Sequence, residues 1–485
     1  MILLLAAVAQ GSPMEFYGFG GRKMGRGGGG VALAEGAESI LQNPAALAGQ
    51  PHPQAAFGFV GVGAEFTQLP KVWWDTNRDG LVDDLDTPLD VGPAVDPVMG
   101  VMVGVSRPIG EYFSFGAGFF LPVNRLLRLQ TFEPQLPTYF LYDNRAQRYE
   151  LMVGAGVRPA WGLSIGGGVQ VIPRAEYRIS ATLDVTIESA GEGDETAGEV
   201  VAVGLDVHDM ELDLVPGFAP VVSLHWDAGQ AIPALDGLEV GASWRGDAGL
   251  PVDVEIDLQL NARTGDIGDL DPLVLPFTLG IGLGVFDHYT PSQLNLGVAY
   301  RLGDTLVLTA DVKRTAWDQA APSIATVTHF TVDGTGLQIP DGTATDGNPY
   351  AVTLEATWSP RMGLELNLPR FRLWPKWGDW VVSVRGGAGF EPTPLVSQSS
   401  ATALLDGDRV LFAFGAGFEH DDPFRRPDHR RRARLDGFFQ YHLVQSGALD
   451  RGQPETPTAG YAVDGSPIPI GGHLLAAGVQ WGFEY

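Results

Sequence analysis

The stretch that decides the fold is LAAGVQWGFEY, residues 475–485, at the end of the chain. An apolar or aromatic residue stands at every odd-numbered position of this stretch: Leu475, Ala477, Val479, Trp481, Phe483 and Tyr485. A period of two with one bulky apolar face is typical of a strand between lipid and a lumen. A soluble β-sandwich also alternates, but its bulky face is the inner one, and we therefore favour a membrane barrel.

The same alternation recurs along the chain, read forward from residue 53 and backward from Tyr485. Strands are expected at about 55–66, 98–107, 112–121, 147–158, 162–178, 216–227, 237–246, 291–301, 304–314, 349–358, 380–390, 409–419, 434–445 and 472–484. Tight turns alternate with long polar connections, as periplasmic turns and extracellular loops do in outer-membrane barrels. The segment 250–286 is either an extracellular hairpin or two further strands. The sequence predicts an all-β, transmembrane antiparallel β-barrel of about 14 strands, or of 16.

Composition limits the partners of this protein. The 485 residues include 31 Lys+Arg and 58 Asp+Glu, which gives a formal net charge of −27. A surface this acidic argues against nucleic acid, because its phosphates require a basic surface. The chain has 65 glycines, which suit tight turns, and no cysteine, so disulfides do not stabilise it.

The N-terminus indicates export. Residues 1–9 are apolar and end in the small-x-small pattern Ala7-Val8-Ala9, which predicts a truncated signal peptide. An apolar N-terminus without a targeting role is the alternative. We expect three regions: this segment, an N-terminal hatch at 10–52, and a barrel at 53–485 whose loop 67–96 is extracellular. The expected location is the bacterial outer membrane, with lipid and lipopolysaccharide as surroundings.

The segment Gly25–Leu47, GRGGGGVALAEGAESILQNPAAL, is expected to plug the barrel. Its glycines have no Cβ, which lets the backbone pack closely against a surrounding wall. The apolar residues from Val31 to Leu41 have a rough helical spacing over about three turns. Pro44 disfavours helix at the preceding residue and ends this segment. The sequence therefore predicts a small helical hatch.

Three stretches resemble a known family. FGGRKMGRGGGGVALAEGAESILQNPAALAG, residues 19–49, resembles the hatch of the FadL-like (TodX-type) outer-membrane transporters of long-chain fatty acids and other hydrophobic compounds. The segments LNLGVAYRLGDTLVLTADVKRTAW (294–317) and VRGGAGFEPTPL (384–395) are similar to strands of the same family. The resemblance implies a fourteen-stranded barrel plugged by its N-terminus. It also implies that a hydrophobic ligand binds in the lumen and leaves sideways through the wall.

The resemblance also suggests where a ligand and a gate lie. Asn43, Pro44 and Ala45 would line the floor of the pocket, and movement of the glycine run, including Gly27, Gly28 and Gly29, would open the gate. The alternative is a rigid plug that only seals the barrel. In that case the protein is an outer-membrane binding or scaffold barrel whose loops recruit partners.

Alternation places Arg158, Lys313 and Arg385 on the lumenal face, where a cation could bind a carboxylate ligand. Asp311 shares the face of Lys313, however, and an ion pair between these two is an equal alternative to a ligand clamp. The ligand is therefore expected to be either a long-chain fatty acid or an uncharged hydrocarbon.

The loop DTNRDGLVDDLD, residues 75–86, has the spacing of an EF-hand loop. The expected Ca²⁺ ligands are Asp75, Asn77, Asp79, Leu81 through its carbonyl, Asp83 and Asp86. Gly80 stands at the sixth position, where the loop must bend sharply. A solvated acidic loop that matches the spacing by chance is the alternative.

The residues do not indicate an enzyme. The nine histidines form no metal-spaced pair, and the Gly25-x-Gly27-x-x-Gly30 pattern opens no βαβ unit. We therefore expect a monomeric, non-enzymatic passive transporter of hydrophobic small molecules.

Overall fold

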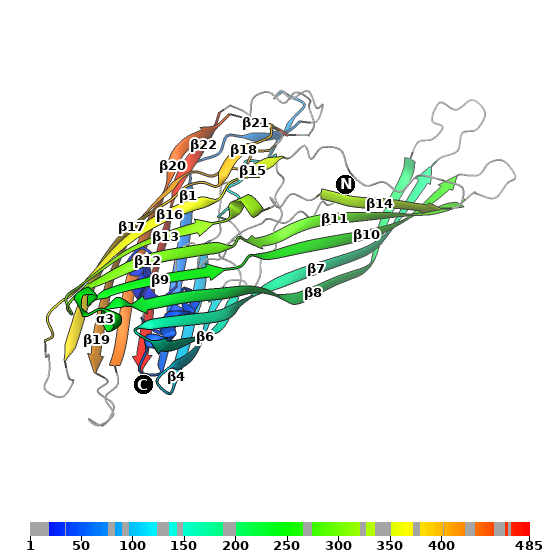
Figure 1. The fold of residues 1–485 in the computed structure, drawn as a ribbon. Coiled ribbons are helices and arrows are strands. Elements are labelled where there is room, and N and C mark those ends of the chain that lie inside the picture. Colours follow the sequence, from blue (N-terminus) through cyan, green and yellow to red (C-terminus); the bar gives the residue numbers. More distant parts are fainter. Residues whose placement is uncertain are drawn as a thin grey trace, which may run out of the picture.

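A closed ring of strands forms the body of the protein. The computed structural model describes residues 19–33, 35–75, 83–89, 97–123, 135–142, 149–187, 200–264, 274–320, 326–334, 351–371, 379–400, 402–421, 432–450, 461–463 and 467–485. The ring consists of β1 (Gln54–Phe66), β4 (Val98–Ile109), β5 (Phe113–Pro122), β6 (Glu150–Ala160), β7 (Leu163–Ile187), β8 (Val200–Asp227), β9 (Leu238–Arg245), β12 (Gln293–Leu302), β13 (Leu306–Thr315), β16 (Thr357–Asn367), β17 (Trp380–Glu391), β19 (Arg409–Asp421), β20 (Arg432–Leu449) and β22 (Ile468–Glu484). Each of these strands pairs with its neighbours antiparallel, and β22 closes the ring on β1, from Gln54↔Glu484 to Phe66↔Gly472 (Figure 1). The predicted transmembrane antiparallel barrel of 14 strands is confirmed.

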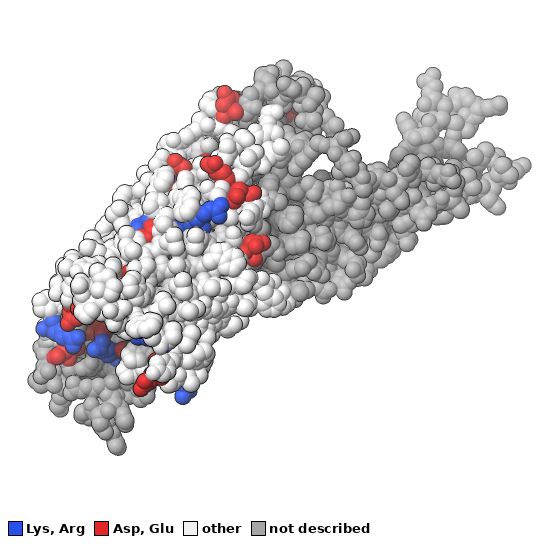
Figure 2. All heavy atoms as spheres, viewed as in Figure 1, with Lys and Arg blue, Asp and Glu red and all other residues white. Residues whose placement is uncertain are grey.

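The two faces of the wall differ as the alternation predicted. On β22, Trp481 is 38% exposed while its neighbour Gln480 is 1% exposed. Large apolar side chains such as Phe57 and Phe414 are exposed on the outside of the wall. Figure 2 shows a broad stretch of this wall without charged residues, between charged groups nearer its two ends. A closed ring whose backbone groups are paired and whose outer face is apolar is what a lipid bilayer requires, and the expected outer-membrane location is confirmed.

The connections also follow the predicted scheme, with one error. Short turns join β4 to β5, β6 to β7 and β12 to β13, and the long connections lie at the opposite end. The strand predicted at 349–358 is wrong, because the wall strand β16 begins only at Thr357 and ends at Asn367. Val352–Leu354 instead forms β15, which pairs with β18 (Leu395–Gln398) in a separate small sheet. Val352 and Leu354 pack against an apolar cluster, and their burial produces the same alternation as a wall strand.

The segment 250–286 is a hairpin and adds no strand to the ring. It belongs to β10 (Ala248–Thr264) and β11 (Val274–Thr290), which pair with each other. The far ends of β7 and β8 continue beyond the ring, β10 pairs with β7 in parallel, and β14 (Thr326–Gly334) pairs with β11. Figure 1 shows this sheet projecting to one side, at the end opposite the C-terminus.

The hatch lies inside the barrel near its periplasmic end (Figure 1, dark blue). It contains α2 (Gly21–Gly25) and two 3₁₀ turns, η1 (Ala37–Leu41) and η2 (Pro44–Gly49). The three-turn helix predicted from Val31 to Leu41 is reduced to the 3₁₀ turn η1, because the positive φ angle of Gly36 (66°) interrupts regular helix there. No helix in the described part of the chain is long and apolar enough to cross a membrane.

Short elements complete the described chain. They are α3 (Ala228–Ala231), η3 (Pro233–Leu235), η4 (Trp317–Gln319) and a three-stranded sheet of β2 (Val72–Trp74), β3 (Thr87–Leu89) and β21 (Tyr461–Val463). The sheet lies outside the ring and holds the two ends of the loop 75–86 side by side, because Trp74 pairs with Thr87.

Candidate functional site

Glycines of the wall let the hatch lie directly against it. A Cβ at Gly156 would lie 2.7 Å from the carbonyl oxygen of Pro44, and one at Gly363 would lie 2.7 Å from that of Arg26. At Gly116 a Cβ would lie 2.9 Å from a methyl carbon of Leu47. The predicted close packing therefore depends on glycines in the wall as well as on those in the hatch.

A buried carboxylate connects the hatch to the wall. Glu365 on β16 accepts hydrogen bonds from Arg22 Nε at 2.9 Å and Arg26 Nη1 at 3.3 Å on the hatch, and from Arg385 Nε at 2.7 Å on β17. The side chain of Glu365 is fully buried. A buried carboxylate with three guanidinium partners is strongly held, and removal of its charge would leave those cations uncompensated.

The same network extends along the wall in both directions. On one side Arg385 donates to Asp436 at 2.6 Å, and Arg434 donates to Glu38 of the hatch at 2.8 Å. On the other side Glu35 of the hatch accepts from Arg26, and Arg301 on β12 lies 3.7 Å from it. The hatch is thus bound by charged groups to four wall strands, β12, β16, β17 and β20.

Lys23 is the unusual member of the hatch. It is fully buried, and its Nζ has no hydrogen-bond partner among the described residues. Burial lowers the pKa of the Lys23 ammonium from 10.5 to about 8, although the carboxylates of Glu38 and Glu35 act in the opposite direction. This cation therefore destabilises the packed hatch at neutral pH.

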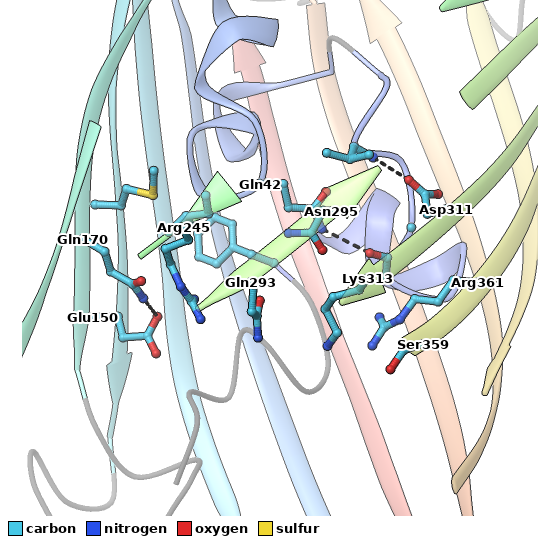
Figure 3. Close-up of a pocket in the computed structure, with 16 residues that line it drawn as sticks. Gln42, Glu150, Gln170, Arg245, Gln293, Asn295, Asp311, Lys313, Ser359 and Arg361 are labelled. Atoms are coloured by element: carbon cyan, nitrogen blue, oxygen red, sulfur yellow. Dashed lines mark hydrogen bonds between the residues drawn. The ribbon is translucent and has the colours of Figure 1, made fainter. Parts of the chain in front are cut away.

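A cavity of about 90 Å³ lies between the hatch and the wall (Figure 3). Its hatch side is formed by Phe19, Gly28, Gly29, Val31, Leu41 and Gln42. Its wall side is mainly polar, and consists of Glu150, Met152, Gln170, Arg245, Gln293, Asn295, Asp311, Lys313, Ser359 and Arg361. The cavity can therefore accommodate polar or charged atoms next to an apolar surface.

The charged groups at this cavity have defined partners. Asp311 accepts hydrogen bonds from the backbone N–H groups of Gly30 at 2.8 Å and Val31 at 3.0 Å. Lys313 donates to Glu391 at 3.4 Å, and Arg361 donates both to Glu391 and to the Gly27 carbonyl. In the structure Lys313 pairs with Glu391, while Asp311 binds the hatch backbone; a ligand clamp at Lys313 stays a prediction.

The residues predicted to form the pocket floor, Asn43, Pro44 and Ala45, do not line this cavity. Asn43 is fully buried; its Nδ2 donates to the carbonyls of Val31 at 2.7 Å and Leu224 at 3.0 Å, and its Oδ1 accepts from Ala45 N–H at 3.1 Å. Pro44 and Ala45 pack against the wall and do not line the cavity. Asn43 therefore holds the hatch in shape, and a role in gating stays a prediction.

The other predicted residues are distributed around the site. Gly28 and Gly29 line the cavity, and Gly27 lies beside it through its bond to Arg361. Among the predicted cations, Lys313 lines the cavity and Arg385 lies in the buried network. Arg158 lies near the periplasmic end of β6, where its Nε donates to Ser164 at 3.4 Å, and it is remote from the cavity.

Two cations at the cavity were not predicted as site residues. Arg245 stands in the strand predicted at 237–246, but alternation within a strand does not give a residue's depth in the barrel. Arg361 was missed because its strand was predicted at 349–358, whereas β16 runs from Thr357 to Asn367. A correct placement of β16 would have put Arg361 opposite Asp311, with which it pairs in the sheet.

A second, smaller cavity of about 40 Å³ lies next to the first and shares Gln293, Lys313 and Ser359 with it. Its apolar lining includes Leu141, Tyr142 and Trp317. Two connecting segments cover it: Thr138 N–H donates to Ala403 and Leu405 N–H donates to Thr138. We call these segments, 135–142 and 402–407, the cap. The second cavity lies against the cap, and the first lies against the hatch.

The calcium-like loop is only partly described. Asn77, Asp79 and Leu81 lie outside the described residues. Asp75 and Asp86 are buried, and Asp83 N–H donates to Asp86 at 3.0 Å. No group of three or more His, Cys, Asp or Glu in the described residues is arranged to hold a metal ion. The Ca²⁺ site therefore stays a prediction.

Comparison with known proteins supports the fold. No family model and no curated protein matches the chain. The crystal structure of a Pseudomonas aeruginosa FadL homologue is similar, with a TM-score of 0.52 and 13% identity over 99% of each chain. The toluene transporters TodX of P. putida and TbuX of Ralstonia pickettii have TM-scores of 0.47 and 0.43, at 16% and 15% identity, over 97% of this chain and 99% and 100% of theirs. The predicted FadL-like fold is confirmed.

Proposed function

We propose that this chain, which has the fold of a FadL homologue, is a passive outer-membrane transporter of hydrophobic small molecules. The observation that carries the proposal is the pair of adjoining cavities, one against the cap and one against the hatch. An apolar molecule crosses the polar lipopolysaccharide layer slowly, and a protein that shields it from water removes that barrier. The neighbouring structures include proteins named as toluene transporters, which is consistent with such cargo.

The polar lining favours an amphiphile, with a long-chain fatty acid ahead of an uncharged hydrocarbon. A carboxylate placed among Lys313, Arg245 and Arg361 would gain charge-assisted hydrogen bonds, whereas a hydrocarbon would desolvate these groups without compensation. The apolar chain of the ligand would extend towards Met152, Phe19 and Leu41.

Transport requires movement of the hatch. The cavity of about 90 Å³ is much smaller than the roughly 300–1,000 Å³ of sites for drug-sized ligands, so a long chain does not fit while the hatch is packed. Displacement of the glycine run from Gly27 to Gly30 would enlarge the cavity on its hatch side. Release sideways through the wall would then deliver the ligand to the bilayer without an aqueous step.

Uptake of labelled palmitate and labelled hexadecane tests this proposal. The host cells should have an intact lipopolysaccharide layer and no fatty-acid transporter of their own. Expression of the protein should raise palmitate uptake, and Lys313→Met should raise the half-saturating concentration roughly tenfold through loss of a charged hydrogen bond. Lys71→Met, at an exposed lysine, is the matched control. Palmitate uptake equal to that of cells without the protein would remove the transport proposal.

A barrel with a fixed plug is the second candidate. The buried network around Glu365 and the close contacts of the wall glycines favour it, because both hold the hatch in place. Such a protein would bind partners through its extracellular loops and would carry no flux.

We also propose that loop 75–86 binds Ca²⁺ as a structural ion. The EF-hand spacing supports this, as does the pairing of Trp74 with Thr87, which brings the first and last positions of the loop together. An ion there would stabilise the extracellular connection after β1.

A further inference from the structure

The backbone ladder of the wall is interrupted between β16 and β17. The pairs that join these two strands end at Arg361↔Gly389. Both strands continue beyond this pair with their other neighbours, β13 and β19. Among the described residues, no backbone pair joins residues 356–360 to residues 390–393. We call these two stretches the wall opening; at about 3.3 Å per residue it is about 16 Å long.

The two strands separate at the wall opening and then meet again. Above it, the N–H of Glu355 donates to the carbonyl of Pro394 at 2.9 Å, and β15 pairs with β18. The pair Val352↔Gln398 has the same register as the ladder below the opening. The strands therefore part over this stretch alone. It lies at the extracellular end of the wall, because β16 begins opposite the end of β13 that is away from the short turn.

Prolines account for the interruption. Pro360 and Pro392 lie in the wall opening and Pro394 follows it, and none of the three has an N–H to donate to a ladder. Proline in a sheet is therefore mostly found at edges and bulges. Unpaired backbone groups that face lipid cost free energy, and irregular backbone at membrane depth is tolerated where it lines a cavity. A wall opening of this kind requires a cavity behind it.

Both cavities reach the wall opening from the inside. Ser359 lines both of them, and Glu391 and Pro392 line the second. On the outside Trp358 is 51% exposed, and the exposed apolar face of β16 continues below it at Met362. A tryptophan at the end of an apolar outer face is typical of the membrane interface. The wall opening therefore lies between the cavities and the outer leaflet.

Three cations meet one carboxylate at the inner side of the wall opening. Glu391 pairs with Arg361, with Arg409 and with Lys313, the last at 3.4 Å. Arg361 is buried, and its Nε has no hydrogen-bond partner among the described residues. Asp406 also lines the second cavity, where it accepts hydrogen bonds from hydroxyl groups. An anion placed next to Glu391 would therefore find charged donors, one of them an N–H that still requires an acceptor.

The cavities can hold a polar head group but no long chain. They measure about 90 and 40 Å³, whereas sites that enclose a drug-sized ligand measure roughly 300–1,000 Å³. Lys313, Ser359 and Arg361 lie together at the larger cavity (Figure 3). A chain that stays in the bilayer keeps its apolar surface out of water without any space in the lumen.

We infer that a single-chain anionic amphiphile of the outer leaflet binds across the wall at this opening. Its head group, a carboxylate or a phosphate, lies against Arg361, Lys313 and Arg409, and its chain stays in the bilayer along Trp358 and Phe390. This binding mode rests on the proposed function for its class of ligand. Binding requires no movement of the hatch, however, and it does not fail if transport fails.

Binding of palmitate, palmitoyl lysophosphatidic acid and hexadecanol to the protein in nanodiscs tests the head group. Hexadecanol has a similar chain without a charge, and we expect it to bind at least tenfold more weakly than the preferred anion. Tighter binding of palmitate identifies a carboxylate ligand, and tighter binding of the lysophosphatidic acid identifies a phosphate lipid. Equal binding of all three overturns the inference.

Glu391→Gln gives a result that a damaged fold does not produce. Removal of this carboxylate leaves its three cations to the ligand, so the preferred anion should bind roughly tenfold more tightly while hexadecanol binds as before. Glu419→Gln is the matched control, because Glu419 pairs with Arg432 at the other end of β19, and it should leave both affinities unchanged. Unchanged or weaker anion binding by Glu391→Gln overturns the inference.

Palmitate with a photoreactive diazirine on its last carbon tests the position of the chain. Cross-links should form on the outer face of the wall near Trp358 and Phe390, and excess unlabelled palmitate should suppress them. Cross-links confined to Phe19, Leu41 and Met152 at the cavity would place the chain in the lumen and overturn the inference, but would leave transport standing. Specific outer-face cross-links in a protein without palmitate uptake would remove the transport proposal and support this site.

Discussion

Arg22 on the hatch donates a 2.9 Å hydrogen bond from its Nε to Glu365 on β16, across 343 residues of sequence. Glu365 has no exposed side-chain surface and also accepts from Arg26 and Arg385. This carboxylate is the point at which the plug and the wall share one buried charge network. The first prediction concerns its removal.

Glu365→Gln should lower the free energy of unfolding in detergent by about 3–5 kcal/mol, because it leaves three guanidinium groups around a neutral amide. The hatch should also become accessible to protease. Glu419→Gln is the control: its pair with Arg432 at 3.3 Å is partly exposed, and its loss should cost at most about 1 kcal/mol. Equal unfolding midpoints for the two variants would remove the structural role assigned to Glu365.

Gly156→Ala should destabilise the packed hatch by about 1–3 kcal/mol, since the new methyl group would meet the backbone of Pro44 and Ala45. The melting temperature in detergent measures this change. Gly61→Ala in β1 is the matched substitution, because a Cβ there meets nothing within 4 Å and should change stability by less than about 0.5 kcal/mol. If the two variants have the same melting temperature, Gly156 is not needed for the hatch to pack against the wall.

Lys23 predicts a pH dependence. The folded ammonium, with its pKa lowered to about 8, loses its proton before the unfolded one, whose pKa is 10.5. The unfolded chain therefore holds more protons between these values, and stability should rise as pH increases from about 8 to 10.5. The destabilisation is fully present below pH 8.

Lys23→Met should remove that rise and stabilise the protein at pH 7 by up to about 3 kcal/mol. Urea unfolding at pH 7 and pH 10 measures both effects. Lys71→Met, at an exposed position, should leave the difference between the two pH values unchanged. A Lys23→Met variant with the wild-type pH dependence would show that the titrating group lies elsewhere.

Calcium binding can be tested in the same protein by titration calorimetry. Asp75→Ala removes the first ligand of the loop and should weaken binding at least tenfold. Asp84 stands at the tenth position, which supplies no ligand in an EF-hand, so Asp84→Ala should bind as the wild type does. If the wild type does not bind Ca²⁺, the alternative holds, and the loop matches the EF-hand spacing by chance.

The wall could be predicted from sequence because a period of two is a property of each strand alone. Trp481 and Gln480 show this: their alternation correctly predicted that Trp481 faces outward and Gln480 faces the lumen. The same period misplaced β16, since Val352 and Leu354 alternate equally well against an apolar cluster outside the ring. Local alternation does not reveal what lies on the other side of a strand.

The site was harder to predict than the wall. Arg385 and Lys313 share the lumenal face by sequence, yet one lies in the buried network with Glu365 and the other at the cavity. Their separation depends on strand register and depth, which are set by contacts between distant segments. The hydrogen bonds from Gly30 and Val31 to Asp311 could not be predicted for the same reason, because they join residues about 280 positions apart.

The central claim, that passage requires the hatch to leave the wall, is tested most directly by locking it. A Cβ at Gly104 on β4 would lie 3.4 Å from the Cβ of Ala37 on the hatch, a separation close to that of a disulfide. Palmitate uptake should be measured for the Ala37→Cys/Gly104→Cys variant before and after reduction, with each single variant as a control. We predict background uptake when the pair is oxidised and recovery on reduction; undiminished uptake by the oxidised protein would contradict the account.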